Sequence, residues 1–191
     1  MSAARYQQAS PTTQDLPAPA PQGGDTPGQP GLGAGHDLHS DGAGFVYLTA
    51  VMDVASRMVL AHKVAITLEA CHAKEIIEQA FARYGLPEIV NTDQGSQFTA
   101  EEFTNAVLSR GCKLSMDGKG AWRDNVFVER LWRLVKYERV YLRAYGAVSE
   151  AKIDVAQYID WYNCERVHAS IEDRPPEQAY WELLPKIAQA A

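Results

Sequence analysis

The 191-residue chain has few cysteines and no long apolar segment. Its three cysteines, Cys71, Cys112 and Cys164, form no CxxC or CxxH pair, so they predict neither a disulfide framework nor a cysteine-based zinc site. No apolar run approaches the roughly 18 residues that span a bilayer, and the N-terminus lacks a basic segment followed by an apolar one. We therefore expect a cytoplasmic protein with one folded domain, no export and no membrane contact.

Residues 1–43 lack the side chains that build a hydrophobic core. They contain no Val, Ile, Phe or Trp, but they hold six of the ten prolines and seven of the fourteen glycines. Such a segment buries too little apolar surface to offset the conformational entropy that it would lose on ordering. It is therefore predicted to be disordered.

The chain also lacks the positive net charge that favours binding to nucleic acid, because its formal net charge is -6. Its basic residues are nevertheless concentrated between residues 123 and 143. The charged residues of this stretch are Arg123, Arg130, Arg133, Lys136, Arg139 and Arg143 against Asp124, Glu129 and Glu138. A local basic stripe can bind DNA phosphates even when the whole chain is acidic.

From residue 44 onwards, apolar periodicity predicts alternating strands and helices. Strands are expected at 45–53, 58–64, 88–91 and 113–116, and helices at 68–84, 100–110, 124–143 and 150–162. The first two strands form a hairpin whose turn is Asp53–Arg57. The apolar face of the helix at 124–143 is expected to include Val128, Leu131, Trp132, Val135 and Leu142. The remaining residues, 163–184, are polar with two prolines and are not assigned to an element.

Two acids stand at a spacing that suggests metal chemistry. Asp93 follows an apolar, β-prone run, Glu129 lies one turn into the helix at 124–143, and thirty-five residues separate them. Two carboxylates that a fold brings together can hold divalent metal ions for phosphoryl transfer. Taken singly, an Asp at a strand end beside Gly is most often a turn or cap residue, and Glu129 is typical of a carboxylate favoured by the helix dipole in the N-terminal turn.

The sequences around these acids resemble the integrase catalytic core of insertion-sequence transposases, relatives of retroviral integrases. The family motif is aspartate, aspartate, 35 residues, glutamate; residues 91–98 resemble its second-acid block and residues 115–133 its third-acid block. Residues 161–180 resemble the C-terminal signature of the family, so the resemblance covers about 44–184. It implies an α/β, ribonuclease H-like mixed sheet with flanking helices. It further implies a partial catalytic core at 44–146 and a C-terminal helical extension at 147–191.

The resemblance also assigns roles to individual residues. Asp93 and Glu129 correspond to two of the three carboxylates that hold two magnesium ions (Mg²⁺). Asp53 corresponds to a hairpin-turn residue and not to a metal ligand. The basic residues expected to contact DNA are Lys119, Arg130, Arg133, Lys136, Arg166 and His168.

Partners follow from the same resemblance. The family acts on the ends of its element and on target DNA, which implies a bacterial, nucleoid-associated enzyme. A homo-oligomer, an assembly with an intact transposase, and an upstream DNA-recognition subunit from another open reading frame are the expected protein partners.

The first family aspartate is missing from its expected position. It lies on the first strand, about nine residues before the position of Gly44, and counting back reaches Gly35. Asp37 and Asp41 are nearby, but no strand pattern surrounds them. The sequence therefore predicts that the first strand is missing, that the metal site is incomplete and that the chain is inactive or severely impaired.

A frameshift explains this vacancy. Residues 33–42 can be back-translated so that the frame one base later encodes Ala-Leu-Asp-Met-Thr-Tyr-Ile-Pro-Met, which is the first-acid block of the family. We therefore predict that residues 1–43 are an out-of-frame translation of the transposase's own gene.

The sequence leaves two other functions open. A non-catalytic DNA-binding remnant would compete for element ends, and it differs from the enzyme in lacking metal-dependent activity. A host nuclease with a ribonuclease H-like fold is disfavoured by the C-terminal blocks at 161–180.

Overall fold

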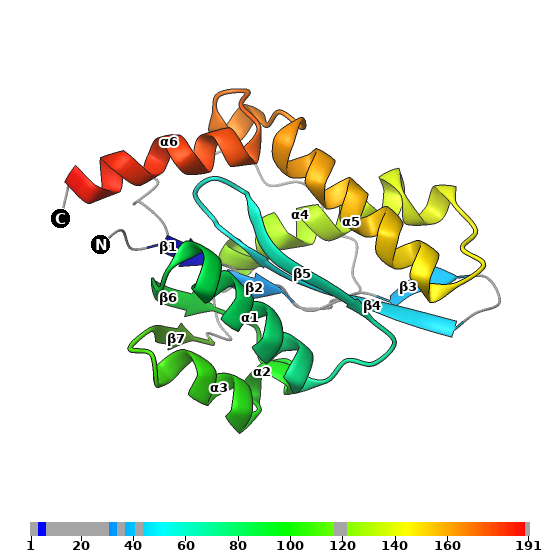
Figure 1. Ribbon diagram of the computed structural model, residues 1–191, viewed down its shortest axis with the longest axis horizontal. Coiled ribbons are helices and arrows are strands. Elements are labelled where there is room, and N and C mark those ends of the chain that lie inside the picture. Colours follow the sequence, from blue (N-terminus) through cyan, green and yellow to red (C-terminus); the bar gives the residue numbers. More distant parts are fainter. Residues whose placement is uncertain (1–3, 7–30, 34–36, 41–43, 117–121, 190–191) are drawn as a thin grey trace.

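The computed structural model describes residues 4–6, 31–33, 37–40, 44–116 and 122–189 (Figure 1). The strands are β1 (Ala4–Tyr6), β2 (Gly31–Gly33), β3 (Asp37–Ser40), β4 (Gly44–Met52), β5 (Val59–Ala65), β6 (Pro87–Asn91) and β7 (Lys113–Ser115). The α-helices are α1 (Ala70–Tyr84), α2 (Ser96–Thr99), α3 (Glu101–Leu108), α4 (Trp122–Glu138), α5 (Val148–Cys164) and α6 (Pro176–Gln189). Two short 3-10 helices are η1 (Val140–Leu142) and η2 (Ala169–Ile171).

The strands form one mixed sheet. β4 pairs antiparallel with β5 on one side, and with β2 and β3 in succession on the other. β6 runs parallel to β1, β2 and β7. β2 thus lies between β4 and β6, so the predicted mixed α/β sheet is confirmed.

The prediction of a missing first strand is wrong, as is the prediction of disorder for Ala4–Tyr6, Gly31–Gly33 and Asp37–Ser40. Gly33 pairs with Ala50 and Asp37 with Tyr47, so β2 and β3 together occupy the place of that strand along β4. The physical reason is that strand pairing uses peptide N–H and C=O groups, which every residue except proline supplies in full. Asp37 therefore begins a strand after all, whereas Asp41 and residue 35 lie outside the described residues.

Helices cover both faces of the sheet (Figure 1). On one face, α1 and α3 pack against Val51, Leu60 and Val90. On the other face, α4 and α5 pack against Val46, Leu48 and Met52. The alternation of inward side chains along β4 explains why one strand serves both clusters. No helix among the described residues is long and apolar enough to cross a bilayer.

The hairpin turn between β4 and β5 is as predicted. The backbone N–H of Arg57 donates to the carbonyl of Asp53 at 2.8 Å, and the Asp53 carboxylate accepts from the N–H and hydroxyl of Ser56 at 2.8 and 2.6 Å. The Asp53 carboxylate therefore caps the turn, in agreement with its assignment as a turn residue.

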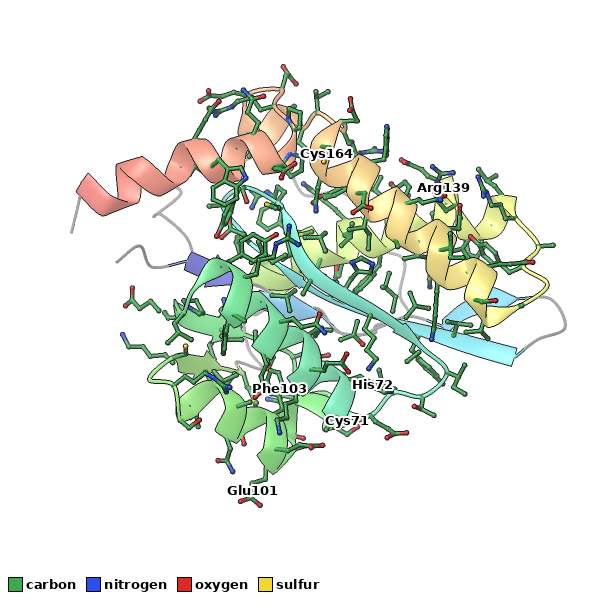
Figure 2. The ribbon with its side chains drawn as sticks, in the orientation of Figure 1. Cys71, His72, Glu101, Phe103, Arg139 and Cys164 are labelled. Carbon is green, nitrogen blue, oxygen red and sulfur yellow. The ribbon has the colours of Figure 1, made fainter. Side chains whose placement is uncertain are left out.

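The long helix ends earlier than predicted. Four of its expected apolar positions, Val128, Leu131, Trp132 and Val135, are buried, but α4 stops at Glu138. Leu142 lies in η1 and is 73% exposed, so its assignment to the buried face is wrong. A charged cluster explains the break: Asp154 of α5 accepts from the hydroxyl of Tyr145 at 2.6 Å and pairs with Arg143 at 2.6 Å, which holds the chain after α4 against α5. Arg139 lies beside α5 at the same junction (Figure 2).

The C-terminal part contains a helix that the apolar periodicity did not predict. α6 begins at Pro176, because the first turn of a helix makes no use of the N–H that proline lacks. Tyr180 of α6 packs in the α1 and α3 cluster, and the Cys164 thiol donates to Glu177 at 3.0 Å where α5 and α6 meet (Figure 2).

Candidate functional site

Asp93 lies two residues after the end of β6, at the edge of the sheet where this parallel strand ends. The N–H of Thr92 donates to the carbonyl of Ser115 at 2.9 Å, which continues the pairing of β6 with β7. Asp93 is half-buried, and its Oδ1 accepts from the N–H of Gly95 at 3.0 Å. The carboxylate is thus held by the backbone that follows it.

Gly95 is required by the close approach of its neighbours. A Cβ atom at this position would lie 2.5 Å from Nε2 of Gln97 and 3.0 Å from Oδ1 of Asp93. Any side chain would therefore displace either the Gln97 amide or the Asp93 carboxylate.

Two buried amides near Asp93 carry polar atoms for which the described residues offer no hydrogen-bond partner. Within the described part of the chain, both side-chain polar atoms of Asn91 and Nε2 of Gln97 are unpaired, although these residues are only 4% and 3% exposed. Val90 belongs to the α1 and α3 cluster, so alternation turns Asn91 towards the opposite face, which α4 covers. Unpaired polar atoms in such a place are typical partners of ordered water or of a hydrated ion.

Glu129 lies in the second turn of α4, on the side of the helix that also carries Lys136. The two residues are seven positions apart, which places them about 20° from each other around the helix axis. The Glu129 side chain is exposed, but surrounding protein atoms still remove enough water to raise its pKa above the ordinary glutamate value. A carboxylate with a raised pKa is poorly solvated when ionised, and a bound cation would relieve that cost.

The raised pKa predicts a pH-dependent effect of Glu129→Gln. Because the folded state holds the Glu129 proton more tightly than the unfolded state does, this residue contributes stability below its ordinary pKa and loses it as pH rises through the folded value. Glu129→Gln is therefore expected to increase the free energy of unfolding at pH 7 by a small amount, since the side chain is exposed. Below about pH 4 the two proteins should be equally stable. Urea denaturation at both pH values measures the difference, and a difference that does not change with pH would contradict the expectation.

The carboxylates of Asp93 and Glu129 are the kind of ligand that Mg²⁺ prefers, but two of them are fewer than the three acids of the family motif. Carboxylate oxygens and ordered water are its usual ligands, and the unpaired amides of Asn91 and Gln97 could hold such water. No group of three or more His, Cys, Asp or Glu side chains with metal-binding geometry occurs within the described part of the chain. The position expected for a third carboxylate, residue 35, lies outside the described residues.

The described members of the predicted DNA-binding set lie in different surroundings. Lys119 lies outside the described residues, and Lys136 is half-buried on the Glu129 side of α4. Arg166 pairs with Glu138 at 2.6 Å, and Glu138 also accepts from the hydroxyl of Tyr158 at 2.8 Å. Arg166 therefore joins α5 to α4, and its guanidinium is already engaged.

The other three predicted residues line one pocket with a cavity volume of about 170 Å³. Its lining residues are Arg57, Phe127, Arg130, Arg133, Leu134, Tyr162, His168 and Ser170. The guanidinium of Arg57 lies 3.3 Å from the ring centroid of Phe127, and that of Arg130 lies 5.9 Å from the same centroid. We name this feature the arginine pocket; it lies between the hairpin turn, α4 and the segment after α5.

Sequence reasoning missed Arg57 as a member of this pocket because it is a hairpin-turn residue far from α4 along the chain. Its positive φ of 67° is uncommon for a residue with a side chain. The hydroxyl of Tyr162 donates to the Arg57 carbonyl at 3.2 Å, and burial raises the pKa of Tyr162, so this donor stays protonated. The sequence offered one signal, the Asp-x-x-Ser-Arg block. Asp53 and Ser56 supply the side-chain hydrogen bonds that cap the turn, so the arginine in this block needs another explanation.

Sequence comparisons match most of the chain. Two family profiles, both described as integrase core domain, match residues 34–121 and 110–176. The transposase for insertion sequence element IS904 of Lactococcus lactis subsp. lactis is 28% identical over 139 residues, covering 70% of this chain and 54% of the relative. The chain spans about half the length of the curated relatives that it matches.

Solved structures share the fold at lower identity. The catalytic core domain of BIV integrase is 20% identical with a TM-score of 0.60, over 78% of this chain and 92% of that one. The HTLV-2 integrase catalytic core domain, solved in complex with magnesium, is 19% identical with a TM-score of 0.57, over 74% of this chain and 88% of that one.

Proposed function

Because the chain belongs to the integrase-core transposases of insertion sequences, we propose that it is a DNA transposase catalytic core that retains two of three metal-binding carboxylates. The observation that carries this proposal is the placement of the two family acids. Asp93 follows β6, and Glu129 lies on α4, the helix that covers the face towards which Asn91 turns. The magnesium complex of the similar HTLV-2 core supports Mg²⁺ as the cofactor.

In this proposal Asp93 and Glu129 bind the metal, and the basic side chains bind DNA. Magnesium in such a site supplies Lewis-acid stabilisation of the negative charge that develops during phosphodiester cleavage and transfer. The Gly95 N–H orients Asp93, and Lys136, two turns after Glu129 on the same side of α4, is proposed to meet the phosphate backbone. Element ends and target DNA are the proposed substrates, as for the family.

The proposed activity is low because the third carboxylate is missing. Gly35 stands where the first family aspartate is expected, and glycine offers no side-chain ligand. The backbone of β2 and β3 still completes the sheet, so the proposed defect is in the chemistry and not in the fold. We attribute the substitution to a frameshift across residues 1–43, and the nucleotide sequence of these codons tests that origin: the frame one base later must encode the aspartate block.

One measurement distinguishes a catalytic enzyme from a non-catalytic DNA-binding remnant. Supercoiled and linear DNA carrying element ends is incubated with Mg²⁺ and either the natural chain or the Asp93→Ala Glu129→Ala variant. Weak nicking or strand transfer that requires Mg²⁺ and disappears in the variant supports the catalytic proposal. Salt-sensitive DNA binding that is equal in both proteins, without any cleavage, supports the remnant instead.

Location and protein partners follow from the family. We propose that the protein works at the bacterial nucleoid in the cytoplasm, as a homo-oligomer or with an intact transposase. DNA recognition is assigned to a subunit from an upstream frame. The core at 44–146 and the extension at 147–191 act as one unit in this proposal, since α5 packs on the sheet.

A further inference from the structure

Gln97 is a buried amide close to Asp93 in the sequence. It lies in α2, it is only 3% exposed, and its Nε2 finds no hydrogen-bond partner among the described residues. Buried donors without a partner are rare in folded proteins, and an ordered water, an ion or a functional contact often accounts for them. The structure places a carboxylate within reach of this donor.

The space beside Gly95 brings the Gln97 amide and the Asp93 carboxylate together. A single point, where a Cβ atom of residue 95 would stand, lies 2.5 Å from Nε2 of Gln97 and 3.0 Å from Oδ1 of Asp93. The N–H of Gly95 donates to the same Oδ1 at 3.0 Å. Two donors, the Gly95 N–H and the Gln97 amide, are thus gathered near one carboxylate, in a gap that a glycine leaves open.

The backbone around Gln97 is held in place by its neighbours. The N–H of Phe98 donates to the carbonyl of Gly95 at 2.9 Å, which ties α2 to the residue whose N–H binds Asp93. Phe98 is fully buried and packs edge-on against Phe103 of α3, with ring centroids 5.3 Å apart. The backbone of α2 therefore cannot move away from Asp93 without disturbing the α1 and α3 cluster.

We propose that Gln97 is a positioning residue for Asp93. Its amide N–H donates to the Asp93 carboxylate, by rotation of the amide or through one ordered water, and holds the carboxylate in the orientation that binds metal. An ionised carboxylate accepts hydrogen bonds and donates none, so the NH₂ end of the amide is the end that suits it. The inference rests on the proposed metal-binding role of Asp93, and Gln97 itself is not a metal ligand in it.

The test measures metal affinity and stability together. Mn²⁺ is the probe, because carboxylate sites bind it as they bind Mg²⁺ and because the electron paramagnetic resonance signal of free Mn²⁺ falls as the protein binds it. Gln97→Leu keeps the approximate size of the side chain and removes its donor, so it is expected to raise the dissociation constant for Mn²⁺ by about 10–100-fold. Gln97→Met, with a more flexible side chain, should do the same.

Stability separates a positioning role from a structural one. Leucine removes a buried amide that has an unpaired donor, so Gln97→Leu should be at least as stable as the natural chain in urea denaturation. Weaker Mn²⁺ binding without a loss of stability supports the proposal. An unchanged dissociation constant, or weaker binding in variants that are also less stable, overturns it.

Gln94→Leu is the matched control. Gln94 is exposed on the same loop, and its amide donates to the carbonyl of Met116 at 3.2 Å, so the change removes an identical group next to Asp93. Its dissociation constant for Mn²⁺ should equal that of the natural chain. If Gln94→Leu weakens binding as much as Gln97→Leu does, the integrity of the loop sets the affinity and the proposal is overturned.

A double-mutant cycle identifies the residue through which Gln97 acts. Gln97→Leu should keep its full effect on Mn²⁺ affinity when it is added to Glu129→Gln, because Asp93 is still present. Added to Asp93→Asn, it should have no further effect. Equal losses in the two backgrounds would mean that Gln97 does not act through Asp93, and would overturn the proposal.

The same titrations distinguish this inference from the proposed function. If the natural chain binds Mn²⁺ no more tightly than the Asp93→Ala Glu129→Ala variant, the proposed metal site fails. If the natural chain binds more tightly than that variant and Gln97→Leu matches the natural chain, the positioning role of Gln97 alone fails.

Discussion

Replacing Gly35 with aspartate is expected to raise the magnesium-dependent strand-transfer rate by about 100-fold, because it supplies the missing metal ligand. Residue 35 lies between Gly33, which pairs with Ala50, and Asp37, which pairs with Tyr47, so the sheet already provides the backbone on both sides. We therefore expect the strand-transfer rate to rise without a change of fold. A strand-transfer assay on DNA with element ends measures it.

Two controls separate a restored site from an added charge. Ala34→Asp adds the same carboxylate one position away from the expected ligand position, and it should leave the rate unchanged. Adding Asp93→Asn to Gly35→Asp should return the rate to the level of the natural chain. A rate in Gly35→Asp no higher than in Ala34→Asp would show that the site lacks something other than this carboxylate.

Asn163→Ala is expected to lower the free energy of unfolding by about 3 kcal/mol, because it removes two buried hydrogen bonds and leaves backbone groups unpaired. The Asn163 amide accepts from the N–H of Val59 and donates to its carbonyl, both at 2.9 Å. Among the described strands β5 pairs only with β4, so its outer edge relies on groups such as the Asn163 amide for hydrogen bonds. Urea denaturation followed by circular dichroism measures the loss.

Asn105→Ala is the control for Asn163→Ala. Asn105 is exposed on α3, so the same change there should alter stability by less than about 0.7 kcal/mol and can even favour the helix. Equal stabilities for the two variants would mean that the Val59 groups find water or another partner when Asn163 is replaced.

Periodicity in the sequence was enough to predict the elements with strong apolar patterns. The hairpin, the helix ending at Tyr84 and the strand before Asp93 all lie within two residues of their predicted bounds. Side-chain pattern could not reveal β2 and β3, since their place in the sheet depends on peptide groups that β4 and β6 leave open. It also missed α6, because a proline such as Pro176 interrupts a helical pattern in the sequence, whereas in the fold it is the first residue of the helix.

The candidate site was predictable where function depends on residues close together in the sequence. Asp93 and Glu129 were identified from their own blocks, and their metal-binding roles remain predictions. The arginine pocket depends on contacts between the hairpin turn, α4 and the segment after α5, which no local pattern encodes. Local pattern also does not show that the Arg166 guanidinium pairs with Glu138, and the contact of Arg166 with DNA remains a prediction.

The two ends of the fold depend on different kinds of interaction. β2 and β3 join the sheet through backbone pairing, whereas α5 contributes the large buried side chains of Tyr158, Ile159 and Tyr162, together with Asn163. A frameshift near the start of the gene that restores the frame before Gly44 therefore leaves a chain that can still fold. A stop codon before α5 removes five of the seventeen buried residues of one hydrophobic cluster, and it removes the Asn163 amide that binds the edge of β5. We expect damaged copies of such genes to yield folded protein when the lesion lies early, and unfolded protein when it lies late.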